Sequence, residues 1–65
     1  MNIELSYTEA IEVKHALIKT VKECDAVLAD RSFEDKYPGC YKSIREQHDR
    51  CCSLVERIQA ELDKI

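Results

Sequence analysis

The feature that most constrains the fold is the near absence of residues that interrupt a helix. The 65 residues include one Gly and one Pro, and the two are adjacent, at Pro38-Gly39. Proline cannot continue a helix that precedes it, and a Pro-Gly pair is a turn signal. The chain therefore has room for two long elements joined near residue 38, and for little else.

Both long segments repeat their apolar residues at helical spacing, in alternating steps of three and four. Ser6 and Glu9 form a capping-box pattern where the first segment begins, and Lys14 is the one charged residue within its stripe. The first stripe contains Ile3, Tyr7, Ala10, Leu17, Val21, Cys24 and Leu28. The second contains Tyr37, Tyr41, Ile44, His48, Cys51, Val55, Ile58, Leu62 and Ile65.

These stripes predict an all-α fold in which residues 1–65 form a single domain, a two-helix antiparallel hairpin with coiled-coil-like packing. We expect a first helix over about residues 6–30, a turn over 31–39 and a second helix over about 40–63. Leu28 then pairs with Tyr41 near the turn and Tyr7 with Leu62 at the far end, and no layer lacks a partner. Two details stay open: a single helical turn capped by Ser32 within the break, and Pro38 as the first residue of the second helix.

The first helix carries more apolar surface than one seam can cover. Ile11 and Ile18 flank its stripe on one side, and Val13 and Val27 flank it on the other. A chain this short buries only about 60% of its unfolded surface, so exposed aliphatic side chains are costly. We predict that these four residues form an oligomer interface, in a homodimeric four-helix bundle or a higher closed oligomer. A dedicated heterologous partner is the alternative.

Charge, hydropathy and cysteine usage limit the partners and the cellular location expected for the chain. The net charge is −3, which disfavours general nucleic-acid binding, although residues 31–50 carry a slight positive excess. No apolar run reaches the ~20 residues of a membrane span, and the start lacks the pattern of a signal peptide. We therefore expect a cytoplasmic protein without membrane contact, whose four cysteines are reduced thiols.

Cys24, His48, Cys51 and Cys52 are the only candidates for a metal site. His48, Cys51 and Cys52 share one helical face, and Cys24 lies about one layer away on the facing helix, so zinc could be held tetrahedrally. The favoured interpretation is that these small side chains pack in the seam, with no metal and no cofactor. A two-helix hairpin also offers no cleft for a Cys–His nucleophile, so we expect no enzymatic activity.

The region around the turn suggests a second kind of site. Tyr37, Tyr41, Lys42 and Arg45 interleave aromatic rings with cations, a combination suited to stacking on a nucleobase and pairing with a phosphate. The simpler interpretation is that the tyrosines close the end of the core while the cations are solvated. Glu34 and Asp35 in the same segment oppose an anionic ligand.

The opening Ile3-Glu4-Leu5-Ser6, followed by Glu9-Ala10 and two helices in sequence, resembles small phage and prophage proteins. The chain also has the length and the Met1 start expected of a complete small gene product. Such phage proteins commonly bind and disable a host factor, and some anti-defence members are oligomeric helical bundles that sequester cyclic nucleotides. The resemblance thus implies an inhibitor of a host protein or a nucleotide sponge.

Overall fold

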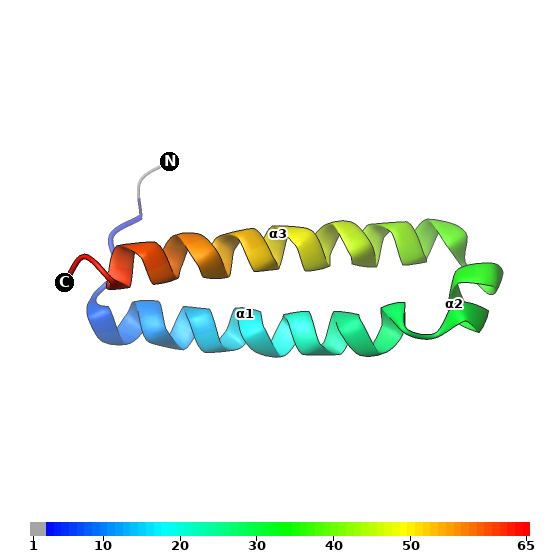
Figure 1. The fold of residues 1–65 in the computed structure, drawn as a ribbon, viewed down its shortest axis with the longest axis horizontal. Coiled ribbons are helices and arrows are strands. Elements are labelled where there is room, and N and C mark those ends of the chain that lie inside the picture. The colour runs from blue at the N-terminus through cyan, green and yellow to red at the C-terminus, as the bar shows by residue number, and fades with distance from the viewer. Residues whose placement is uncertain (1–2) are drawn as a thin grey trace.

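Three helices account for most of the computed structural model, which describes residues 3–65. They are α1 (Tyr7–Leu28), α2 (Arg31–Lys36) and α3 (Pro38–Leu62). The two long helices, α1 and α3, run antiparallel and pack against each other, with α2 at the turn (Figure 1). The predicted all-α hairpin is confirmed, and no strand occurs within residues 3–65.

The start of α1 follows from its first residues. The Ser6 hydroxyl accepts a hydrogen bond from the Glu9 backbone N–H at 3.2 Å, and the Glu9 carboxylate accepts one from the Ser6 N–H at 2.9 Å. This is the predicted capping box, and it satisfies two backbone donors that the helix itself leaves unpaired. The same contacts lower the pKa of Glu9, because the backbone and hydroxyl groups of Ser6 favour the carboxylate form.

The structure resolves both details left open for the break over residues 31–39: a short helix, α2, lies within it, and Pro38 is the first residue of the second long helix. Asp30, rather than Ser32, caps α2: its carboxylate accepts hydrogen bonds from the Ser32 N–H at 3.0 Å and the Phe33 N–H at 3.4 Å. The second long helix begins at Pro38 instead of about residue 40. Proline is well suited to a first helical position, since its missing N–H has no partner to lose there.

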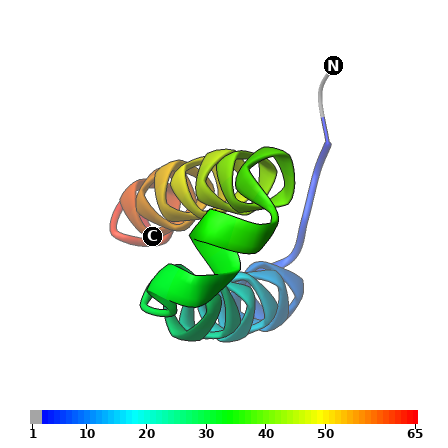
Figure 2. The ribbon, with the colours of Figure 1, turned by 90° about the vertical axis from the view of Figure 1, so that its right-hand side faces the viewer.

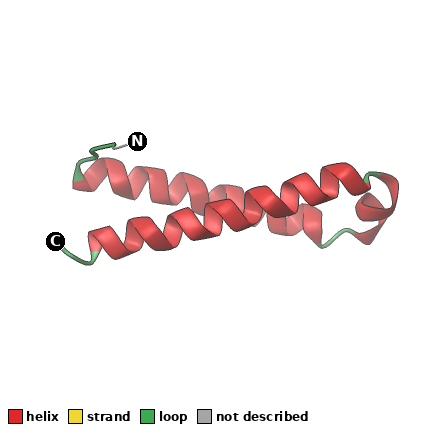
Figure 3. Ribbon diagram, turned by 90° about the horizontal axis from the view of Figure 1, so that it is seen from above, coloured by secondary structure: helices red, strands yellow, loops and turns green. Residues whose placement is uncertain are grey.

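The seam between α1 and α3 is built from the two predicted stripes. Cys24 and Cys51 are the two buried residues among residues 3–65, at 6% and 8% exposure. The Tyr41 hydroxyl donates a hydrogen bond to the Leu28 carbonyl at 3.1 Å, which places this predicted pair side by side. Seen from above, the two helices cross at a shallow angle (Figure 3). The half-buried stripe members are Ala10, Lys14, Leu17, Val21, Leu28, Tyr41, Ile44, His48, Val55, Ile58 and Leu62.

A single layer of helices gives the molecule the shape of a thin rod, 45 × 22 × 14 Å (Figures 1 and 2). Its radius of gyration is 14.3 Å, against about 10.7 Å for a compact domain of the same length. Each long helix therefore buries one stripe and leaves its remaining faces in solvent. No helix within residues 3–65 combines the length and apolar character that crossing a bilayer requires.

Candidate interaction surface

Two sides of the hairpin flank the seam, and each is formed by one row of residues from each long helix. On α1, the residues directly after Ala10, Leu17 and Cys24 lie on one side of the seam, and those directly before Lys14, Val21 and Leu28 lie on the other. Because the helices are antiparallel, the equivalent residues of α3 lie on the same two sides. The first side, here called the bridged side, comprises Ile11, Ile18, Asp25, Arg45, Cys52 and Gln59. The second, here called the open side, comprises Val13, Thr20, Val27, Cys40, Gln47, Leu54 and Glu61.

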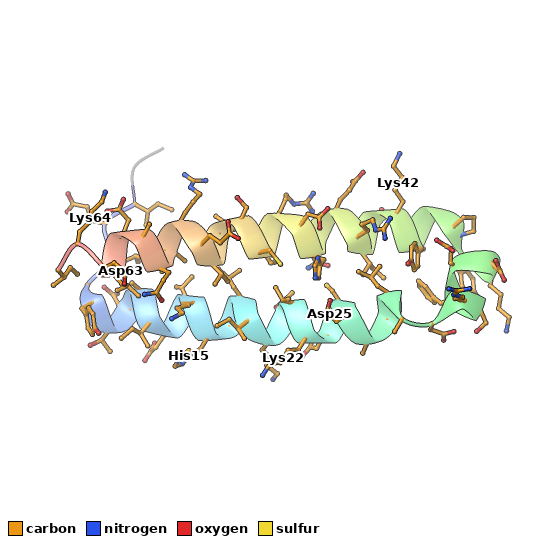
Figure 4. The ribbon with its side chains drawn as sticks, viewed as in Figure 1. His15, Lys22, Asp25, Lys42, Asp63 and Lys64 are labelled. Atoms are coloured by element: carbon orange, nitrogen blue, oxygen red, sulfur yellow. The ribbon has the colours of Figure 1, made fainter. Side chains whose placement is uncertain are left out.

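Polar contacts link the two helices along the bridged side. His48 Nε2 lies 2.8 Å from Asp25 Oδ1, and Figure 4 shows Asp25 directed from α1 toward α3. Lys14 Nζ donates a hydrogen bond to Gln59 Oε1, so the charge that interrupts the first stripe finds a partner on the opposite helix. The Gln59 amide in turn donates to Asp63 at 2.7 Å. Polar groups on this side thus find their partners within the chain.

The open side has no comparable links. Its one charged side chain, Glu61, pairs with Lys64 at 3.0 Å near the end of the chain. Its contact across the helices is a weak one, from Cys24 Sγ to Gln47 Oε1 at 4.0 Å. Val13 and Leu54 remain 39% and 41% exposed. Between Val13 and Leu54, the open side is an uncharged strip that the chain covers only in part.

An apolar groove continues the open side at the end where the chain termini lie. Residues 3–5, before α1, pass beside the two helices rather than across their end (Figure 2). Ile3, Leu5 and Leu54 line the groove formed with the last turns of α3. Ile3 is 71% exposed, so the groove is open to solvent. Exposed apolar residues therefore gather at this end of the open side.

The structure divides the four residues predicted to form an oligomer interface. Ile11 and Ile18 lie on the bridged side and are half-buried. Val13 and Val27 lie on the open side, where Val27 is also half-buried and Val13 is exposed. Sequence reasoning missed Leu54, the exposed apolar residue that α3 contributes to the open side. Its position directly before Val55 of the second stripe could have identified it.

The thiols and His48 are placed in or beside the seam. Burial raises the pKa of the Cys24 thiol, and Cys51 nearby raises it further; burial, with Asp25 close by, also raises the pKa of Cys52. Cys52 Sγ lies 3.9 Å from His48 Nε2, the nitrogen that Asp25 already engages. A raised pKa disfavours the thiolate that binds metal or attacks a substrate. Within residues 3–65, no three ligating side chains converge on a metal position.

Of the four residues predicted to bind a nucleotide, the structure brings Tyr41 and Arg45 together, and Tyr37 and Lys42 lie outside the hollow that these two line. Tyr37 packs against Phe33, with ring centroids 5.5 Å apart. The Arg45 guanidinium lies 5.8 Å from the Tyr41 ring centre, and the Tyr41 hydroxyl is bonded to Leu28. Lys42 points away from the hairpin (Figure 4). The hollow beside Tyr41 has balanced charge, since Arg31 and Arg45 share its lining with Glu34 and Asp35.

Fold and surface together define a small helical hairpin with one side closed by polar contacts and one side left uncovered. The chain matches no protein-family model, no curated protein and no solved structure.

Proposed function

We propose that this chain is a non-enzymatic interaction module that works in the cytoplasm as a homo-oligomer and binds a protein of a host cell. The observation that carries the proposal is surface area. The chain exposes 5317 Å², whereas a compact monomer of 7.5 kDa exposes about 4,250 Å². The excess of roughly 1,000 Å² is close to what one partner buries in a protein–protein interface of standard size.

Energetics support the same conclusion. Burying apolar surface contributes about 25 cal/mol per Å², and a core of this size rarely supplies more than ~3–5 kcal/mol on its own. Only Cys24 and Cys51 are buried among residues 3–65, and no side chain there is fully buried, so the single hairpin has little apolar burial. A second layer of helices would add burial where the chain is thinnest, and domains are normally built from at least two packed layers.

The absence of enzymatic activity remains part of the proposal. Catalysis by a thiol requires an activated thiolate next to a free base and a water-excluding cleft. Burial raises the pKa values of Cys24 and Cys52, and Asp25 already engages His48. These features favour a role in packing for the thiols. The choice of a host protein as partner follows from the resemblance to small phage proteins, many of which bind and disable a host factor.

Native mass spectrometry of the full chain tests the proposal directly. At micromolar concentration we expect a mass of two or more whole chains of 7.5 kDa each, with no retained ligand. A monomer at every concentration up to the millimolar range would contradict the homo-oligomer. A retained nucleotide would favour the sponge instead, and one zinc per chain would favour a metal-binding protein.

A further inference from the structure

Two rows of opposite charge border the open side. On α1 the row next to Val13, Thr20 and Val27 repeats every seven residues and consists of Glu9, Ala16 and Glu23. Asp30 continues this spacing beyond the end of α1, where it caps α2. On α3 the row next to Cys40, Gln47 and Leu54 consists of Ser43, Arg50 and Arg57, and Lys64 continues it beyond the end of α3, where it pairs with Glu61. All eight residues are exposed. Every charged residue of the first row is acidic and every charged residue of the second is basic, so acids and bases border opposite edges of the open side.

We propose that a second copy of this chain docks on the open side, with the twofold axis of the dimer parallel to the helices. This inference rests on the proposed self-association and specifies its surface and geometry. Rotation about such an axis keeps every residue at its own level along the rod and exchanges the two helices. Each α1 then packs against the partner's α3, all neighbouring helices are antiparallel, and the acidic row faces the partner's basic row.

Charge selects this axis over its alternative. Two copies can also meet through the open side about a twofold axis perpendicular to the helices. That arrangement places α1 on the partner's α1, so the acidic rows face each other and the basic rows do likewise. Like charges face to face oppose such an arrangement, whereas unlike charges fix the register of the first one.

The levels of individual residues agree with the chosen axis. The contact between Cys24 and Gln47 marks a common level on the two helices. Glu23 lies one residue and Arg50 three residues further from the turn, so their levels differ by about 3 Å at 1.5 Å per residue. Glu23 therefore lies beside the partner's Arg50, and the symmetry creates this pair twice. No salt bridge within residues 3–65 engages either residue.

Apolar residues also match under this symmetry. Leu54 lies at a level between those of Val13 and Thr20, so it inserts between these side chains of the partner's α1. The exposed apolar groove, with Ile3 and Leu5, lies at the terminal end of the open side. An axis parallel to the helices brings the two apolar ends together, whereas a perpendicular axis would place each apolar end near the partner's polar turn.

Charge exchange tests the geometry. Glu23→Lys and Arg50→Glu are prepared separately, and their dimer dissociation constants are measured by sedimentation equilibrium. Each variant alone sets like charges opposite one another at both symmetric pairs, and should dimerise about tenfold more weakly or worse. An equimolar mixture restores unlike charges at both pairs, so we expect a heterodimer with the affinity of the unaltered chain. Glu46→Lys, on the outer surface of α3, is the matched control and should leave the dissociation constant unchanged.

The outcomes separate this inference from the proposed function. If the unaltered chain is monomeric, both are overturned. If it dimerises but the mixture binds no more tightly than the separate variants, self-association stands and the open-side geometry is wrong. Circular dichroism of each variant should show unchanged helicity, since Glu23 and Arg50 are exposed. Restored affinity in the mixture, with helicity unchanged throughout, supports the geometry.

Discussion

The bridged and open sides of the hairpin flank the same seam, yet they differ in how completely the chain satisfies them. On the bridged side, Asp25 meets His48 and Lys14 meets Gln59 across the helices, over the half-buried Ile11 and Ile18. On the open side, Val13 and Leu54 are exposed beside one weak sulfur contact. Polar groups that are already paired within the chain gain little from a partner, whereas exposed apolar side chains gain burial from one.

The difference also indicates how a small chain can separate folding from recognition. Cross-helix contacts on the bridged side set the pairing of α1 with α3 within one chain. The open side remains available to a partner chain, and the charge rows beside it favour one orientation of that partner over another. The bridged side thus stabilises the hairpin, and the open side forms the contact between chains.

The largest expected effect comes from placing a lysine at an aliphatic position on the open side, and the same change on the bridged side is its comparison. Leu54→Lys, on the open side, should raise the dimer dissociation constant by about 100-fold, because it removes a buried leucine worth about 2 kcal/mol and adds a charge that must be desolvated. It should change the free energy of unfolding of the isolated chain by no more than about 0.5 kcal/mol. Sedimentation equilibrium and urea denaturation below the dissociation constant measure the two quantities.

Ile18→Lys is the counterpart on the bridged side. Ile18 is half-buried within the hairpin, so this change should lower the free energy of unfolding of the single chain by ~1–2 kcal/mol while folded chains still associate. The reverse result, in which Ile18→Lys dissociates the oligomer and Leu54→Lys does not, would make the bridged side the interface.

The second prediction compares the effect of a Cys→Ser substitution on the free energy of unfolding in the seam and on the open side. Cys51→Ser should lower the free energy of unfolding by roughly 1–3 kcal/mol, because a hydroxyl at a position only 8% exposed is desolvated without an assured partner. Cys40→Ser makes the same change at an exposed position and should cost less than about 0.5 kcal/mol. Urea denaturation followed by circular dichroism checks both. Equal effects would mean that Cys51 does not belong to the closed seam.

Much of the hairpin could be predicted from the sequence because its helices depend on local patterns. The stripes identified which residues are buried, including Cys24 and Cys51, and Ser6 with Glu9 identified the start of α1. These features follow from a period of 3.6 residues and from contacts three residues apart. The same periodicity in two antiparallel helices also predicts the pairing of Leu28 with Tyr41.

The surfaces were harder to predict because they depend on choices that periodicity does not determine. Helix α2 forms because the Asp30 side chain turns back onto the Ser32 and Phe33 amides, although Asp could equally have been solvated. The partner of Lys14 is a residue 45 positions away, Gln59, selected by side-chain reach rather than spacing. Leu54 lies outside the second stripe, so periodicity assigns it no role and predicts excess apolar surface on α1 alone.

The third prediction concerns the cross-helix link on the bridged side. Asp25→Asn removes the carboxylate next to His48, and an exposed pair of this kind contributes about 0.2–1 kcal/mol. Urea denaturation gives the free energies of unfolding of the variant and the unaltered chain. In a His48→Gln background the same substitution should have no effect; a loss of equal size there would show that Asp25 acts through something other than His48.

The smallest expected effect is the alkaline dependence that the seam imposes on stability. Burial, followed by the proximity of Cys51, raises the pKa of Cys24 in the folded chain, whereas an unfolded thiol titrates near its ordinary pKa of about 8.5. A raised folded pKa means that the unfolded state releases its proton first as the pH rises. The stabilising contribution of the neutral thiol is therefore complete below about pH 8.5 and declines as the pH rises through the folded pKa. Cys24→Ala should flatten the fall in the free energy of unfolding between about pH 8 and pH 9.5, measured by urea denaturation under reducing conditions. Cys40→Ala, at an exposed thiol on the open side, should leave that slope unchanged. If the two variants give the same slope, the seam does not shield Cys24 from water. Cys24, the most buried residue of the seam, would then be no better protected than Cys40 on the open side.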